Sequence, residues 1–204
     1  SVYDKDLTEI DSGNVIDRTG DNARAFEGLF LTFAVDMARD EALYLIDNDQ
    51  GYVVEKYKNV TRYDTSFEIN NSNFKKIPEM MTMDDMHELK DKDGAYSVPY
   101  ALYEKEGYLI TCFFQAPRYR KPVKPPYYYD VSTVEGDVLY SGVLEYPFLC
   151  EDSSDKVFFY VKQEGGWFED DLHFLVGVTT ADLLNGLVSK TSIDDSIEQI
   201  KNRK

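Results

Sequence analysis

The stretch SVPYALYEKEGYLITCFF, residues 97–114, has the clearest strand pattern in this chain of 204 residues. Its halves, 97–105 and 107–114, are rich in aromatic and β-branched residues, and the turn Glu106-Gly107 separates them. A connection this short cannot contain a crossover helix, so the two strands must be antiparallel. The stretch therefore predicts a β-hairpin and, with it, an antiparallel sheet.

The same pattern recurs on both sides of this hairpin. Apolar or alternating segments are separated by turn sequences that contain Gly, Asp or Ser. Strands are expected at 42–46, 52–57, 65–69, 137–146, 156–163 and 173–178, and YYYDV, at 127–131, is expected to begin another. These segments predict that most of the sheet is antiparallel.

The strongest helical signal lies between residues 22 and 39. Asp21 and Asn22 resemble a helix cap, and apolar residues then recur at spacings of three and four, as one helical face requires. These residues are Phe26, Leu29, Phe30, Phe33 and Met37. We therefore expect an N-terminal amphipathic helix over 22–39 that packs on the sheet.

Shorter helices are expected later in the chain. Patterns that resemble capping boxes open helices over 83–90 and 193–203, and TADLLNGL, residues 180–187, adds a turn or two. The capping pairs are Thr82 with Asp85 and Ser192 with Asp195. Helices and strands together predict an α+β fold.

The first 21 residues differ from the rest of the chain. They are rich in carboxylates and lack periodic hydrophobicity, which is typical of a polar arm. We expect residues 1–21 to form an acidic N-terminal arm. Residues 22–204 are expected to form a single α+β domain, because their length is ordinary for one domain.

The charge balance limits the partners that the protein can bind. The chain carries 22 Lys and Arg against 38 Asp and Glu, a formal net charge of −16. Such an excess of carboxylates repels nucleic-acid phosphates and anionic lipid headgroups, and attracts cations. No apolar run approaches the roughly 18 residues of a membrane span. We therefore expect a basic protein partner, no nucleic-acid binding and no membrane insertion.

Two features of the sequence bear on the cellular compartment: whether a signal peptide is present and how the cysteines are used. No signal peptide is visible, which favours a cytoplasmic location over a secreted or surface-anchored one. Because the chain begins at Ser1 rather than Met, removal of a leader stays open, and an extracytoplasmic surface protein with a flexible arm is the alternative. Cys112 and Cys150 lie among apolar residues and are expected as buried free thiols, a bridge between them being the alternative.

The segment RYRKPVKPPYYYD, residues 118–130, opposes the acidic background. It holds four cations, three prolines and four tyrosines, and no carboxylate occurs between Gly107 and Tyr129. Three interpretations compete: a PPxY or PxxP ligand for another domain, an anion-recognising loop, or a stiff connection whose cations contact the protein's own acidic surface. We favour the third, because the prolines restrict the backbone before the next strand begins.

Partner-binding residues are expected among aromatic and cationic side chains. Tyr, Trp and Arg are enriched among the residues that dominate binding energy at protein interfaces. The candidates are Tyr127, Tyr128, Tyr129, Arg118, Arg120 and Trp167.

No metal or cofactor is expected. DNDQG (47–51) and DKDG (91–94) begin like calcium loops but lack the Glu that an EF-hand needs at its twelfth position. Met83, Met86 and His87 offer thioethers and an imidazole, a ligand set suited to Cu(I). Flexible methionines also fill gaps in a core or form adaptable contacts, and we favour that role.

The sequence contains no nucleophile elbow, glycine-rich phosphate loop, HExxH or CxxC motif. If the chain is an enzyme or a small-ligand binder, its pocket is expected between helix 22–39 and the sheet, with His173, Asp170 and Asp171 as acid–base candidates. We favour a non-enzymatic interaction module that resembles inhibitors or immunity proteins, because an acidic, Tyr-rich surface accelerates encounters with basic proteins.

Overall fold

A computed structural model describes residues 2–3, 9–11, 33–37, 42–47, 51–58, 62–78, 83–105, 107–118, 120–151, 156–165 and 171–202. Its strands are β1 (Val2–Tyr3), β2 (Glu9–Asp11), β3 (Phe33–Met37), β4 (Leu43–Asp47), β5 (Val53–Lys58), β6 (Arg62–Glu68), β7 (Ser97–Lys105), β8 (Tyr108–Gln115), β9 (Tyr127–Thr133), β10 (Val138–Leu144), β11 (Phe148–Glu151), β12 (Lys156–Gln163) and β13 (Leu172–Thr179). Its helices are α1 (Met83–Lys90), α2 (Thr180–Leu184) and α3 (Lys190–Lys201).

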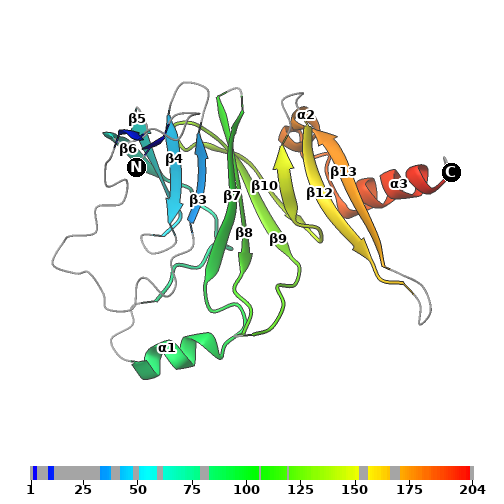
Figure 1. Ribbon diagram of the computed structural model, residues 1–204, viewed down its shortest axis with the longest axis horizontal. Helices are drawn as coiled ribbons and strands as arrows, with labels where there is room; N and C mark the ends of the chain where they lie inside the picture. The colour runs from blue at the N-terminus through cyan, green and yellow to red at the C-terminus, as the bar shows by residue number, and fades with distance from the viewer. Residues whose placement is uncertain are drawn as a thin grey trace.

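Most strands belong to three antiparallel sheets, each made from consecutive strands (Figure 1). The first sheet has the order β3-β4-β5-β6, the central sheet β10-β9-β8-β7 and the third β11-β12-β13, while β1 pairs with β2. The predicted antiparallel pairing is therefore confirmed, in three main sheets rather than one. In the part of the chain that the structure describes, no helix is long and apolar enough to cross a membrane.

Strand β8, in the middle of the central sheet, is buried on both faces. On one face, Leu109 and Phe113 of β8 pack with residues of β4 and β5 from the first sheet. On the other face, Ile110 and Cys112 pack with residues of the third sheet and of α3. Successive residues of a strand point to opposite faces, so β8 contributes to both cores. This explains why its sequence is almost continuously apolar.

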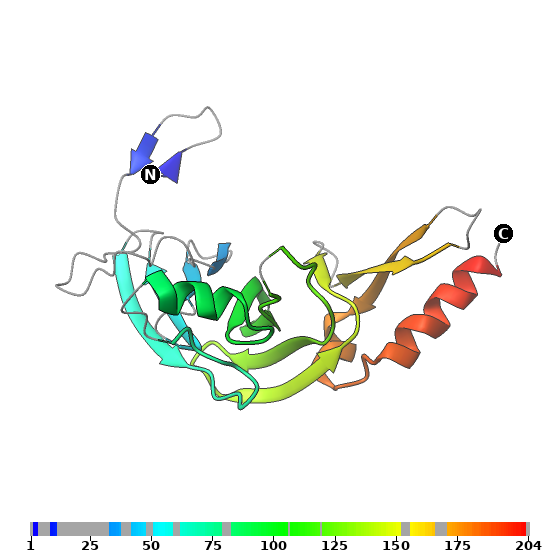
Figure 2. The same cartoon turned by 90° about the horizontal axis from the view of Figure 1, so that it is seen from below.

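The third sheet and the C-terminal helices lie on the opposite side of the central sheet from the first sheet (Figures 1 and 2). α3 begins after Ser189, whose hydroxyl accepts the backbone N–H of Ser192, and the Ser192 hydroxyl accepts the N–H of Ser189 in return. Val188 and Ile193 on either side of this capping box share one buried cluster, as in a hydrophobic staple. The predicted cap at Ser192 is therefore wrong, because the staple starts the helix three residues earlier.

The predicted N-terminal helix is wrong for residues 33–37. They form β3, which pairs antiparallel with β4, from Phe33 opposite Asp47 to Met37 opposite Leu43. The large apolar residues in FAVDM alternate, so the segment fits a period of two as well as one of 3.6. Pairing with the buried strand β4 favours the extended conformation. Residues 22–32 and 38–39 lie outside the described residues.

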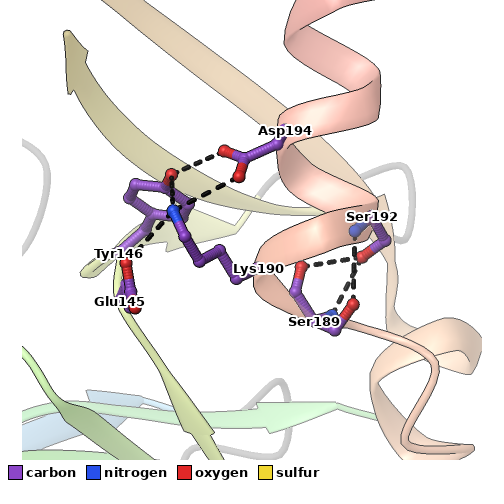
Figure 3. Close-up of polar contacts among 6 residues, drawn as sticks. All are labelled: Glu145, Tyr146, Ser189, Lys190, Ser192 and Asp194. Atoms are coloured by element: carbon purple, nitrogen blue, oxygen red, sulfur yellow. Dashed lines mark hydrogen bonds and ion pairs between the residues drawn. The ribbon is translucent and has the colours of Figure 1, made fainter.

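A polar cluster attaches the start of α3 to the loop after β10 (Figure 3). Tyr146 donates a hydrogen bond of 2.6 Å to Asp194, and Lys190 Nζ lies 3.1 Å from Glu145 and 3.3 Å from Asp194. The hydrogen bond from Tyr146, followed by Lys190, lowers the pKa of Asp194. Burial, and next the bond to Asp194, raises the pKa of Tyr146. The cluster therefore keeps a phenol as donor and a carboxylate as acceptor across the neutral range.

Asp194→Ala is expected to lower the free energy of unfolding by about 1 kcal/mol near pH 7, because it removes a partly exposed hydrogen bond and ion pair. The folded pKa of Asp194 is depressed, so this stability is present above the ordinary Asp pKa of about 3.9 and is lost as the pH falls through the folded value. Urea unfolding near pH 7 and near pH 2 measures the difference.

The matched control is Asp195→Ala, which removes the next carboxylate of the same helix, an exposed one. It should change the free energy of unfolding little at either pH. A deficit for Asp194→Ala that is equally large at both pH values would contradict the role given to its charge.

Candidate functional site

The outer face of the third sheet gathers exposed and half-buried apolar and aromatic side chains. Leu175 of β13 lies directly opposite Tyr160 of β12 and is 57% exposed. Gly177 lies opposite Phe158, and a Cβ at this glycine would come within 2.9 Å of Phe158 Cε1, so the ring lies across the glycine backbone. His173 lies two residues before Leu175 in β13 and therefore on the same face of the sheet. Phe158, Tyr160, His173 and Leu175 form what we name the outer-face row.

Two of the predicted catalytic residues, His173 and Asp171, lie at the end of this row. His173 Nδ1 is 2.6 Å from the Tyr160 hydroxyl, and the two rings stack. The carboxylate of Asp171 accepts hydrogen bonds from Lys162 (2.6 Å) and from the backbone N–H of Gly165 (3.0 Å). Lys162 first, and then Gly165, lowers the pKa of Asp171, which makes this carboxylate a weaker general base. Asp170 lies outside the described residues.

The part of segment 118–130 that precedes β9, residues 118–126, is named the basic loop, and it is partly anchored to the protein's own carboxylates, as the sequence predicted. Arg118 donates its backbone N–H to Asp93 (2.6 Å), and its Nε lies 3.4 Å from an oxygen of Asp91. These carboxylates belong to the DKDG turn, where Gly94 has a φ of +65°. The turn therefore serves as an anchor for the loop. Lys121 and Lys124 form no ion pair with any described residue, so the prediction is wrong for these two cations.

The three candidate tyrosines open β9 and face the interior to different degrees. Tyr129 is buried (3% exposed) on the side of the third sheet. Tyr128, which completes the PPxY pattern, stacks on the buried Phe113 with ring centroids 4.9 Å apart. Tyr127 is half-buried and makes an edge contact with Tyr100. The contacts of these three rings in the folded chain are therefore mainly packing contacts within the protein.

The remaining partner candidates differ in position. Arg118 and Arg120 are exposed, and Arg120 has a φ of +63°. Trp167 lies outside the described residues. Partner binding by the arginines stays a prediction.

A groove of about 680 Å³ lies between the basic loop and the DKDG turn. It is lined by Asp93, Gly94, Gln115, Ala116, Pro117, Arg118, Lys121, Pro122, Lys124, Pro125 and Pro126. Three of these residues are cations and one is a carboxylate, a balance opposite to that of the chain.

The helix of the methionine cluster is confirmed, and α1 has the bounds predicted from the sequence. His87 is exposed on it, while the side chains of Met83 and Met86 lie outside the described part of the chain. Across the described ranges, no group of three His, Cys, Asp or Glu side chains is placed to hold one metal ion.

A buried carboxylate that the sequence analysis did not single out organises the face toward the first sheet. Asp130 is 0% exposed and accepts hydrogen bonds from the Tyr52 hydroxyl (2.7 Å), from the Asn71 amide (2.8 and 2.9 Å) and from the Ser141 hydroxyl. The Thr111 hydroxyl lies 2.5 Å from that of Tyr52. Burial, and next the charge of Asp130, raises the pKa of Tyr52 well above its usual value. Tyr52 therefore remains a donor at any ordinary pH.

The predicted free thiol at Cys112 is confirmed, and it is buried. Burial, and next the charge of Asp130, raises the pKa of this thiol. A buried thiol with a raised pKa is unreactive, because the thiolate is the nucleophile. The side chain of Cys150 lies outside the described residues.

No protein-family model, curated protein sequence or solved structure matches this chain, so its function has to be inferred from its own residues.

Proposed function

We propose that this chain is a non-enzymatic interaction module, of the kind represented by inhibitors and immunity proteins, that binds a basic protein. The observation that carries the proposal is the outer-face row of Phe158, Tyr160, His173 and Leu175. A single exposed Leu is ordinary, whereas an exposed Leu beside half-buried aromatic side chains on one sheet face is typical of an interface. Tyrosine supplies contact area at low cost in side-chain entropy.

The net charge of the whole chain is the basis for proposing a basic partner. A net charge of −16 creates a field that attracts cations and repels anions. Electrostatic fields of opposite sign accelerate the encounter of two proteins. Salt screens this attraction, with a screening length of about 8 Å at physiological ionic strength, and so slows association. The row thus supplies contact energy and the net charge supplies the association rate.

The test is capture of the partner from extracts of the native host by the immobilised chain, with Leu175→Thr compared with the wild type. Threonine keeps the strand preference and removes apolar contact area, so captured partner is expected to fall roughly tenfold, the equivalent of about 1.4 kcal/mol. Once identified, the partner should be basic. Its association rate should fall roughly tenfold or more between low and high salt.

Leu187→Thr is the matched control, because Leu187 is similarly exposed (62%) but lies outside the sheets, before α3. It should leave capture unchanged. Equal capture by the wild type and Leu175→Thr, or an association rate that does not respond to salt, would count against the proposal.

A further inference from the structure

The groove beside the basic loop shares no lining residue with the outer-face row. We propose that it binds an extended peptide segment of a partner protein that carries at least two carboxylates. The carboxylates would pair with Lys121, Lys124 and the free part of the Arg118 guanidinium. The proline rings of the groove would contact the carbon atoms between them.

The cationic side chains of the groove are available to pair with a ligand. Lys121 and Lys124 are exposed and have no ion-pair partner among the described residues. Arg118 uses only its Nε toward Asp91, at 3.4 Å, which leaves the two terminal nitrogens of a guanidinium that is half exposed. A guanidinium can hold a carboxylate with two parallel hydrogen bonds. Asp93, the carboxylate of the lining, already accepts the backbone N–H of Arg118.

The walls of the groove are fixed before any ligand arrives. The backbone N–H of Gly94 donates to Ala116 (2.7 Å), and that of Ala116 donates to Tyr96 (2.8 Å). Four prolines restrict the loop between Pro117 and Pro126. A site that is already ordered loses little conformational entropy when it binds, so more of the contact energy appears as affinity.

The shape and charge favour a peptide over other anions. A volume of about 680 Å³ is within the usual range of ligand sites and exceeds the size of a single phosphate ion. The cations are separated along the loop by prolines, which suits carboxylates separated by apolar carbon atoms. A nucleic acid would bring many more closely spaced negative charges toward a chain of net charge −16 than a short segment with a few carboxylates, so the long-range field opposes it more strongly.

The test uses a synthetic ten-residue peptide of alternating Glu and Ala, with an alternating Gln and Ala peptide as the uncharged counterpart. Isothermal titration calorimetry at low salt should show binding of the Glu peptide alone. NMR shifts should change at residues 93–94 and 115–126. The Lys121→Glu/Lys124→Glu variant should weaken binding at least tenfold, because it replaces two attractions with two repulsions.

The matched control is Lys58→Glu/Arg62→Glu, which changes the net charge equally at the exposed ends of β5 and β6, outside the lining of the groove. It should retain binding, as should Leu175→Thr, so failure here is distinguishable from failure of the proposed function. Equal weakening by both double variants would overturn the proposal. So would tighter groove binding of a ten-residue oligothymidylate, or self-association of the chain that the Lys121→Glu/Lys124→Glu variant abolishes.

Discussion

Asp130→Ala is expected to lower the free energy of unfolding by about 3–5 kcal/mol, because it leaves several buried or part-buried hydrogen-bond donors without their common acceptor. The carboxylate is the common acceptor for Tyr52, Asn71 and Ser141. Without it, these hydrogen-bond donors lose their acceptor inside the fold, and a buried unpaired donor costs about 1–3 kcal/mol. Urea unfolding of the wild type and the variant measures the loss.

Two further variants separate the network from simple loss of volume. Asp130→Asn keeps the shape and one acceptor oxygen, so it should be less destabilising than alanine. Tyr52→Phe, combined with Asp130→Ala in a double-mutant cycle, should show a coupling of at least about 1 kcal/mol. A loss below about 1 kcal/mol for Asp130→Ala would show that water replaces the carboxylate without difficulty.

Phe113→Ala is also expected to lower the free energy of unfolding by about 3–5 kcal/mol. Phe113 is fully buried in the centre of β8 and stacks on Tyr128 with an interplanar angle of 9°. Tyr52 and Phe74 contact it edge to face, with ring centroids 5.4 and 5.1 Å away. Alanine leaves a cavity among rings that hold one another in place, which adds to the lost transfer energy. Thermal and urea unfolding both report the change.

Phe113→Leu fills most of the same space and should cost less than half as much. Leu139→Ala, at a position of β10 that is 53% exposed, is the surface control and should change the free energy of unfolding by at most about 0.5 kcal/mol. Similar losses for Phe113→Ala and Leu139→Ala would show that the aromatic cluster contributes no more than an exposed side chain does.

Features that depend on neighbours in the sequence could be predicted from the sequence. The strands at 97–105 and 156–163 and the helix at 83–90 have the predicted bounds. In each case a periodic segment is bounded by turn or cap residues, so the local signal is complete. Antiparallel pairing followed from connections too short for a crossover.

Features decided by distant partners could not be predicted. FAVDM fits a helix and a strand equally well, and only β4 beside it selects the strand. The start of α3 depends on Val188 and Ile193 reaching the same buried cluster. Asp130 looked like an ordinary strand residue, because its partners come from positions as far away as Tyr52.

The basic loop was understood in part. Its stiffness and the anchoring of Arg118 followed from prolines and from the excess of carboxylates. That Lys121 and Lys124 have no such anchor depends on where the DKDG turn ends relative to the loop, which no local pattern encodes. Of the candidate catalytic residues, His173 and Asp171 both lie close to the start of β13, because they are only two residues apart in the sequence.

Each of the three main sheets is built from one continuous piece of chain. During translation, β4, β5 and β6 can join by hairpin closure, a microsecond event, before β7 has left the ribosome. The apolar side of that early sheet then stays uncovered until the central strands are made, and the second side of the central sheet stays uncovered until α3 is released. The nascent chain is therefore most exposed to aggregation after the central sheet is made and before the third sheet and α3 cover it.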